Sequence, residues 1–185
     1  MPRMTADQFL DWDGGGHVGK LELVHGEVRA MSPASPTHAQ LQGNLTGLIW
    51  AHLRAQKLPC RVAPEAPVQP QIHANDNVRV PDIAVTCAPP GKDKYFPAPV
   101  LIIEILSPSN KKDTWNSIYA MATIPALKEI AVVDSETVRV EVFRLLEGGG
   151  WPEHGEVTEN GGTVQLVSIS AAFPIAEIYA GTYLA

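Results

Sequence analysis

Two short apolar runs constrain the fold of this 185-residue chain more than any other feature. The segments VRVPDIAVTC and PVLIIEILS occupy residues 78–87 and 99–107, are rich in β-branched side chains and are bounded by Pro or Gly. Such runs are typical of strands that are buried on both faces. We therefore expect an α/β (α+β) fold with a central, mixed, strongly bent sheet flanked by helices.

The remaining pattern predicts the elements around that sheet. Spacings of three to four residues between apolar side chains, together with capping residues, predict helices at residues 4–12, 38–56 and 110–123. Alternation predicts a hairpin that turns at His25-Gly26, an edge or irregular strand at 61–72, and two strands within 129–145. The tail at 163–181 is expected to add a strand and a short helix. Asn110 and Asp113 are the candidate caps of the third helix.

Composition limits the class of protein. With 45% hydrophobic and 18% charged residues, the chain has material for one core, so residues 1–185 are expected to form a single domain. The net charge of −6 disfavours avid, nonspecific binding of DNA. The N-terminus lacks an apolar leader, and no apolar run reaches the length of a membrane span. Cys60 and Cys87 stand alone without zinc-site spacing, which favours a reducing cytoplasm.

Two acids interrupt the apolar runs. Asp82 lies in the first and Glu104 in the second. An ionised carboxylate inside a buried strand costs several kcal/mol unless it is paired or coordinated. If the two strands are neighbours, the acids lie within ~5 Å of each other, and their hard oxygen ligands suit Mg²⁺ or Mn²⁺. The alternative is that each acid ends a strand and pairs with a turn, with Arg79 or with Lys111.

Four segments occur in an order that resembles a known family. They are LELVHGEVRAMSPASPTH, VRVPDIAV, LIIEILSPSNKKDTW and IPALKEIAVVDSE. In this order they resemble the Uma-two family of restriction endonucleases, within the PD-(D/E)XK nuclease superfamily, over roughly residues 5 to 180. The resemblance implies a restriction-endonuclease-like fold. It also implies metal-dependent hydrolysis of DNA phosphodiester bonds.

The resemblance also implies roles for particular residues. Asp82 and Glu104 match the motif acids that bind the metal, and the backbone carbonyl of Ile105 is the expected further ligand. Glu22 matches an upstream acid that binds metal directly or through water, with a solvated strand acid as the alternative. His38, in an SPxxxH-like segment, could face the metal or orient a phosphate, and a capping or surface histidine is the alternative.

One residue departs from the motif. Two positions after Glu104, where the superfamily has its lysine, this chain has Leu106. Lys111 or Lys112 could reach inward from the following loop, although paired loop lysines are commonly solvated. Ser107 and Asn110, like these two lysines, are candidates for contact with substrate phosphate, and a plain turn explains them equally well.

Three functions remain after the sequence is considered. The first is a cytoplasmic Mg²⁺- or Mn²⁺-dependent endonuclease acting on DNA, with a homodimer as one assembly that could cut both strands. The second keeps the fold but, without the motif lysine, binds nucleic acid or a protein partner with little or no catalysis. The third is a structural homodimer formed through exposed apolar strands such as VRVEVFRL. His25, His52, His73 and His154 have no ligand spacing and are interpreted as structural or surface residues.

Overall fold

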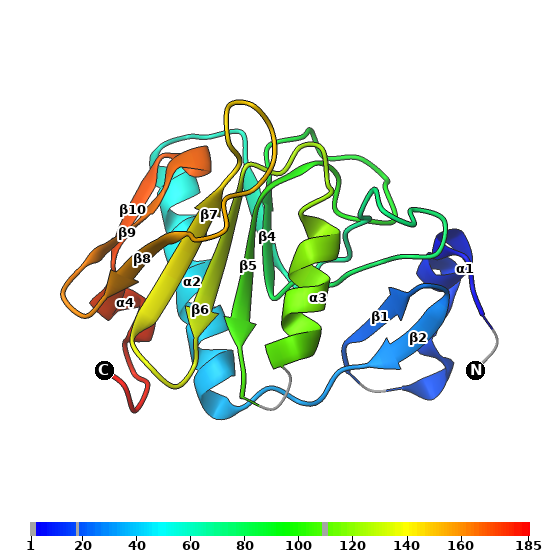
Figure 1. Cartoon of the computed structure of the whole chain (residues 1–185), viewed down its shortest axis with the longest axis horizontal. Helices are drawn as coiled ribbons and strands as arrows, with labels where there is room; N and C mark the ends of the chain where they lie inside the picture. The colour runs from blue at the N-terminus through cyan, green and yellow to red at the C-terminus, as the bar shows by residue number, and fades with distance from the viewer. Residues whose placement is uncertain (1–2, 18, 109–110) are drawn as a thin grey trace.

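The computed structural model describes residues 3–17, 19–108 and 111–185. Its centre is a six-stranded sheet in the order β3-β4-β5-β6-β7-β8 (Figure 1). The strands are Arg61–Pro64, Ile83–Thr86, Pro99–Leu106, Glu129–Asp134, Arg139–Arg144 and Glu156–Glu159. Neighbouring strands are antiparallel except β5 and β6, which are parallel and joined through helix α3, Lys111–Met121. The predicted mixed sheet is therefore confirmed.

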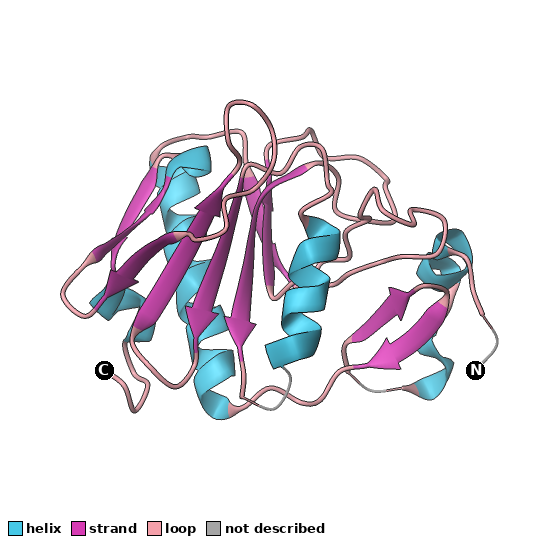
Figure 2. Cartoon of the chain, in the orientation of Figure 1, coloured by secondary structure: helices cyan, strands magenta, loops and turns pink. Residues whose placement is uncertain are grey.

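Helices cover both faces of this sheet (Figure 2). Alternate residues of β5 point to opposite faces because a strand has a side-chain period of two. Leu101, Ile103 and Ile105 pack in the same apolar cluster as the buried residues of helix α2, Pro36–Ala55. On the other face, Ile102 packs with residues of α3. Glu104 lies on this second face, toward α3, because it is two residues from Ile102.

An N-terminal unit packs beside α3. It contains helix α1, Ala6–Asp11, the short 3-10 turn η1, Gly14–Gly16, and the hairpin of β1, Leu21–Val24, with β2, Glu27–Ala30. Thr5 caps α1 through a capping box. The predicted helix within residues 4–12 and the predicted turn at His25-Gly26 are therefore confirmed. An isolated bridge joins Leu23 of β1 to Val78, which attaches the hairpin to the segment that leads into β4.

The C-terminal part corrects one prediction. VRVEVFRL was expected to expose an apolar edge, but β8 pairs with β7, so β7 is an inner strand. Strand β8 could not be predicted from the sequence, because only one of its four residues is buried and it therefore shows almost no apolar alternation. Next come a second hairpin of β9, Thr163–Leu166, and β10, Ala171–Pro174, the 3-10 turn η2, Val167–Ile169, and helix α4, Ile175–Tyr179.

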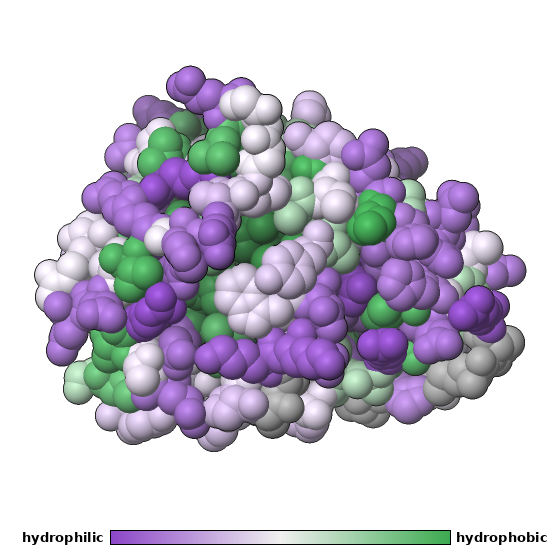
Figure 3. Space-filling model, viewed as in Figure 1, coloured by the Kyte–Doolittle hydropathy of each residue, from purple (hydrophilic) through white to green (hydrophobic). Residues whose placement is uncertain are grey.

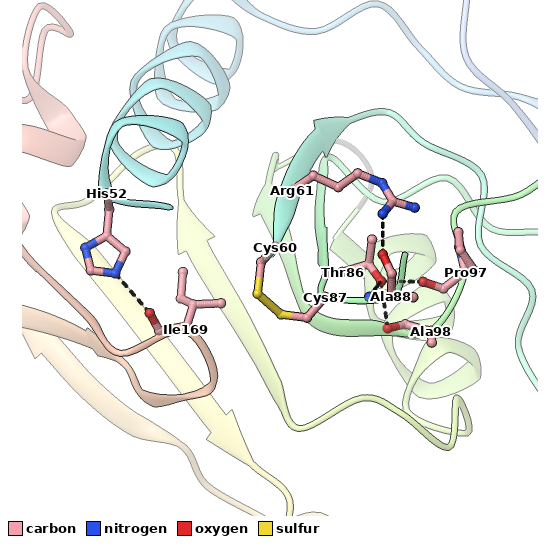
Figure 4. The surroundings of a disulfide bond; sticks show 9 residues. All are labelled: His52, Cys60, Arg61, Thr86, Cys87, Ala88, Pro97, Ala98 and Ile169. Carbon is pink, nitrogen blue, oxygen red and sulfur yellow. Dashed lines mark hydrogen bonds between the residues drawn. A yellow bond between two sulfur atoms is a disulfide. The ribbon is translucent and has the colours of Figure 1, made fainter. Parts of the chain in front are cut away.

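The two cysteines form a disulfide, so the expectation that they stand alone is wrong (Figure 4). Arg61 pairs with Thr86 in the antiparallel β3–β4 register, which places Cys60 opposite Cys87 one step further along. The pairing depends on this register rather than on local spacing. Spacing motifs therefore could not reveal it.

The surface face in Figure 3 is mostly hydrophilic, with an apolar hollow near its centre. A pocket on this side is lined by aromatic residues of α3, β7 and the following loop, among them Trp115, Phe143 and Trp151. Within the described residues, no helix has the length and hydropathy needed to cross a membrane.

Candidate active site

The β4–β5 register brings the two strand acids together. Ile83 pairs with Ile103 and Ala84 with Ile102, so the same antiparallel register places Asp82 opposite Glu104. Directly opposite side chains in such a pair have Cβ atoms about 4.5–5.5 Å apart. Both acids are buried, with 4% of each residue exposed. The sheet itself therefore builds a pair of neighbouring carboxylates on the face toward α3.

These acids line a cleft of 380 Å³ beside the carboxyl end of β5. In Figure 1 this end of β5 and the first turns of α2 and α3 lie along the same lower edge of the molecule. The lining comes from β5, from α2 and from the residues just before β1, just before β4 and just after β5, namely Lys20, His38, Asp82, Glu104, Ile105 and Ser107. The cleft thus combines residues that are distant in sequence.

Asp82 is the most connected side chain in the cleft. Its Oδ1 accepts a hydrogen bond of 2.9 Å from Lys20 Nζ, and its Oδ2 accepts one of 2.8 Å from the backbone N–H of Ile105. Nε2 of His38 lies 3.3 Å from Oδ1. The backbone carbonyl of Asp82 accepts a further hydrogen bond, of 2.8 Å, from Gln42 Nε2. Asp82 is therefore held by groups from β5, from α2 and from the residue before β1.

His38 and Gln42 project from the start of α2. Ser35 caps this helix by accepting a hydrogen bond from the His38 N–H, which fixes the first turn. His38 and Gln42 are four residues apart, so they lie on the same face of the helix. His38 Nδ1 lies 3.5 Å from Ser107 Oγ, beyond the end of β5. The imidazole therefore bridges Asp82 and the loop after β5.

Burial and charge act differently on the ionisable groups of the cleft. Burial alone would raise the pKa of Asp82, but the hydrogen bond from His38 and the charge of Lys20 outweigh it and hold the pKa well below its usual range. Burial raises the pKa of Glu104 well above its usual value, and the nearby charge of Asp82 raises it further. Burial would lower the pKa of Lys20, yet the charges of Glu104 and Asp82 raise it.

Glu22 takes a different place from the one expected of a cleft ligand. Its Oε1 accepts a 2.9 Å hydrogen bond from the Val80 N–H, and its Oε2 lies 3.3 Å from Arg79 Nη1. Ser117 of α3 donates a longer bond of 3.4 Å to Oε1. Glu22 lines a neighbouring pocket rather than the cleft of Asp82. Its charge still helps to raise the pKa of Lys20.

The structure does not bring the loop lysines into the cleft. Lys111 and Lys112 are exposed on the first turn of α3, and neither lines the cleft. Ser107 does line it, whereas Asn110 lies outside the described residues. Asp113 lies within the first turn of α3 rather than at its cap.

Lys20 is the cation that sequence reasoning missed. The motif places a lysine two residues after Glu104, but here the ammonium group comes from the residue that precedes β1. Its side chain is 13% exposed and that of Asp82 is 6% exposed, so the ion pair is largely shielded from water. A lysine directly before a strand that also contains an acid, as in KLELV, was the only signal in the sequence.

The donor set of the cleft fits a hard divalent cation. Asp82 and Glu104 supply carboxylate oxygens, and the N–H of Ile105 points at Asp82. Since the N–H and C=O of one strand residue point to the same side, the Ile105 carbonyl faces this side as well. One ammonium group faces two buried carboxylates, and burial, with the charge of Asp82, raises the pKa of Glu104. Such oxygen ligands suit Mg²⁺ or Mn²⁺.

Comparisons with known proteins place the chain in a family. No curated protein matches the chain. A solved structure described as a "putative nuclease belonging to DUF820 from Anabaena variabilis ATCC 29413" has a similar fold, with a TM-score of 0.71 and 21% sequence identity. The similarity covers 96% of this chain and 98% of that one. The family model described as "Uma2: Putative restriction endonuclease" matches residues 6–175, so the chain belongs to the Uma2 family.

Proposed function

We propose that this protein is a divalent-metal-dependent nuclease that hydrolyses phosphodiester bonds of DNA in the cleft around Asp82 and Glu104. The observation that carries the proposal is the buried pairing of these two carboxylates with the Lys20 ammonium group, 2.9 Å from Asp82. Membership of the Uma2 family supports a nuclease. The metal and the DNA substrate are inferred from the chemistry of the donor set.

The residues of the cleft divide the chemistry between them. Asp82, Glu104 and the carbonyl of Ile105 would hold the ion, which when bound polarises the scissile phosphate and lowers the pKa of a water molecule. Lys20 stays protonated because its pKa is raised, so it acts as a fixed positive charge rather than as a base. Its ammonium group can neutralise charge that develops on the phosphate oxygens.

His38 and Gln42 position the metal ligand Asp82. Gln42 holds the backbone of Asp82, and His38 contacts both its carboxylate and Ser107. Groups that orient a ligand in this way matter for function, because their loss typically lowers metal affinity or activity about 10- to 100-fold. They also hold the carboxylate in place when no ion is bound.

Cleavage of supercoiled plasmid DNA tests the proposal. The wild type is assayed with Mg²⁺ and with Mn²⁺ beside Asp82→Asn and Glu104→Gln, which keep the size of each side chain and remove its charge. Glu147→Gln is the matched control, because this exposed acid lies in the loop after β7. Both cleft variants are expected to lose cleavage, while the control keeps the wild-type rate.

Folding must be shown to be intact by circular dichroism before the rates are compared. If the wild type cuts DNA with neither metal, or if the cleft variants cut as fast as the control, the nuclease proposal is wrong. The noncatalytic binding module would then be tested by DNA binding. Its sequence argument, a missing cation, is weakened because Lys20 supplies one.

A further inference from the structure

Two histidines and an aspartate converge at the opposite end of β1 from Lys20. His25 lies in the β1–β2 turn, and His73 and Asp76 lie in the loop of residues 71–76. One ligand atom from each residue lies within 4.8 Å of the others. The two imidazole rings meet edge to face, with centroids 4.7 Å apart. Among the described residues, this is the only group of three His, Cys, Asp or Glu side chains that meets this criterion.

The backbone holds these side chains in place. His25 and His73 have φ angles of 51° and 53°, in the left-handed region. His25 is followed by Gly26 at φ 80°, and consecutive positive angles are the geometry that joins two strands through a two-residue turn. The Asp76 N–H donates to the His73 carbonyl over 3.0 Å, which closes the second loop.

The two loops are also tied to each other. The Gly26 N–H donates a 2.8 Å hydrogen bond to the Asp76 carbonyl. Leu23 and Val78 exchange two backbone hydrogen bonds of 2.9 Å, and both residues are fully buried. The backbone that carries His25, His73 and Asp76 is therefore already ordered, which reduces the entropy lost when an ion binds.

We propose that His25, His73 and Asp76 form a binding site for a transition-metal ion of the Zn²⁺ type. Imidazole nitrogens suit Zn²⁺, whereas Mg²⁺ prefers oxygen ligands only. Two imidazoles and one carboxylate leave a fourth tetrahedral position for water. Ligand atoms around zinc are about 3.4 Å apart. Since those of the cluster lie within 4.8 Å of one another, the side chains must close by at most about 1.4 Å. Both histidines are exposed, so no buried contact opposes this closure.

The bound ion would clamp two segments of the candidate active site. One segment is the β1 hairpin, whose other end presents Lys20, and the second runs from Asp76 through Val78 to Asp82. An ion that binds only the folded state stabilises it. With free Zn²⁺ about 100-fold above Kd, the Tm is expected to rise by about 5 to 10 °C. This site does not depend on nuclease activity.

Zinc titration of the metal-free full-length chain tests the proposal, using calorimetry and thermal melting. His25→Asn and His73→Asn remove the imidazoles, and asparagine tolerates the left-handed backbone at both positions. His154→Asn is the matched control, because this histidine is exposed outside the cluster. Asp82→Asn shows whether zinc binds instead at the cleft.

The wild type and His154→Asn are expected to bind zinc equally at this site and to show the same rise in Tm, and Asp82→Asn is expected to keep the zinc site of His25 and His73. His25→Asn and His73→Asn should weaken binding by about 10-fold or more. In the wild type, NMR of the histidine ring protons should show His25 and His73 shifting together on addition of zinc, a result that requires no variant to fold. Absence of a Tm rise in the wild type, equal binding by both imidazole variants, or loss of binding only in Asp82→Asn would overturn the proposal.

Discussion

The two ends of β1 present two different kinds of donor cluster. Lys20, before the strand, enters a buried group of carboxylates whose charges are coupled. His25, after the strand, joins an exposed group that contains two imidazoles. Strand β1 has four residues, so the α-carbons of Lys20 and His25 are about 17 Å apart. One short strand therefore separates an oxygen-rich site from a nitrogen-rich one.

The difference shows how burial and ligand type select an ion. In the cleft, two buried carboxylates share one ammonium group, so a divalent cation gains binding energy by neutralising negative charge that water does not reach. At the exposed cluster, desolvation is small and the imidazole nitrogens decide the choice of ion. The same protein is thus expected to separate Mg²⁺ from Zn²⁺ by position.

The largest expected effect on cleavage comes from removing the positive charge of Lys20. Lys20→Met should lower Mg²⁺-dependent cleavage by about 100-fold or more, because a positive charge near the scissile phosphate is lost. Lys20→Arg keeps the charge and should retain part of the rate. The measurement is the initial rate of plasmid nicking. An unchanged rate in Lys20→Met would show that the ion pair with Asp82 has no part in catalysis.

A smaller loss is expected from the residues that orient Asp82. His38→Gln should lower cleavage about 10- to 100-fold, mainly by lowering the affinity for Mg²⁺, because the imidazole no longer holds the carboxylate of Asp82. Rates measured over a series of Mg²⁺ concentrations separate lost affinity from lost turnover. If high Mg²⁺ restores no activity and affinity is unchanged, His38 acts on the substrate instead.

The buried carboxylate of Glu104 should also lower the stability of the folded protein when no metal is bound. Glu104 has a folded-state pKa above its unfolded value, so without metal the folded protein loses stability as pH rises from the ordinary carboxyl pKa to that raised value. Glu104→Gln removes the buried charge and should stabilise the metal-free protein at neutral pH by about 1 to 3 kcal/mol. Thermal melts across pH, with chelator present, measure the change. A lower Tm in Glu104→Gln at neutral pH would contradict the assignment.

The smallest effect on cleavage is expected from a substitution at the His25 end of β1, away from the cleft. His25→Asn should change Mg²⁺-dependent cleavage by no more than about twofold, since sites well beyond 10 Å with no shared partner usually behave independently. Cleavage is measured at saturating Mg²⁺ in the absence of zinc. A large fall in rate would mean that the hairpin transmits changes from His25 to Lys20, and the two ends would have to be treated as one unit.

Local patterns were sufficient for most of the elements. The runs around Asp82 and Glu104 predicted neighbouring inner strands, and the structure pairs β4 with β5. Helix α2 begins at Pro36 rather than at residue 38, because Ser35 is the residue that caps it. Alternation and capping are properties of adjacent residues, so a single sequence carries them in full.

Lys20 and the Cys60–Cys87 pair depend instead on contacts between distant segments. Lys20 reaches Asp82 only because the β1 hairpin docks along the segment that contains Val78. The motif lysine is expected after Glu104, where the sequence offers Lys111 and Lys112, and the structure places both on an exposed turn. The role of Glu22 was likewise unpredictable, because its partners Arg79 and Ser117 come from two other parts of the chain.

The disulfide between Cys60 and Cys87 has a consequence for self-association. It fastens β3, an outermost strand of four residues that ends in Pro64, onto β4. A short, pinned strand with proline offers few free N–H groups to a strand from another molecule. The opposite border, β8, carries the exposed charge of Glu159, and Glu156 there is paired with Arg144. Both borders of the six-stranded sheet therefore disfavour edge-to-edge pairing with a second copy.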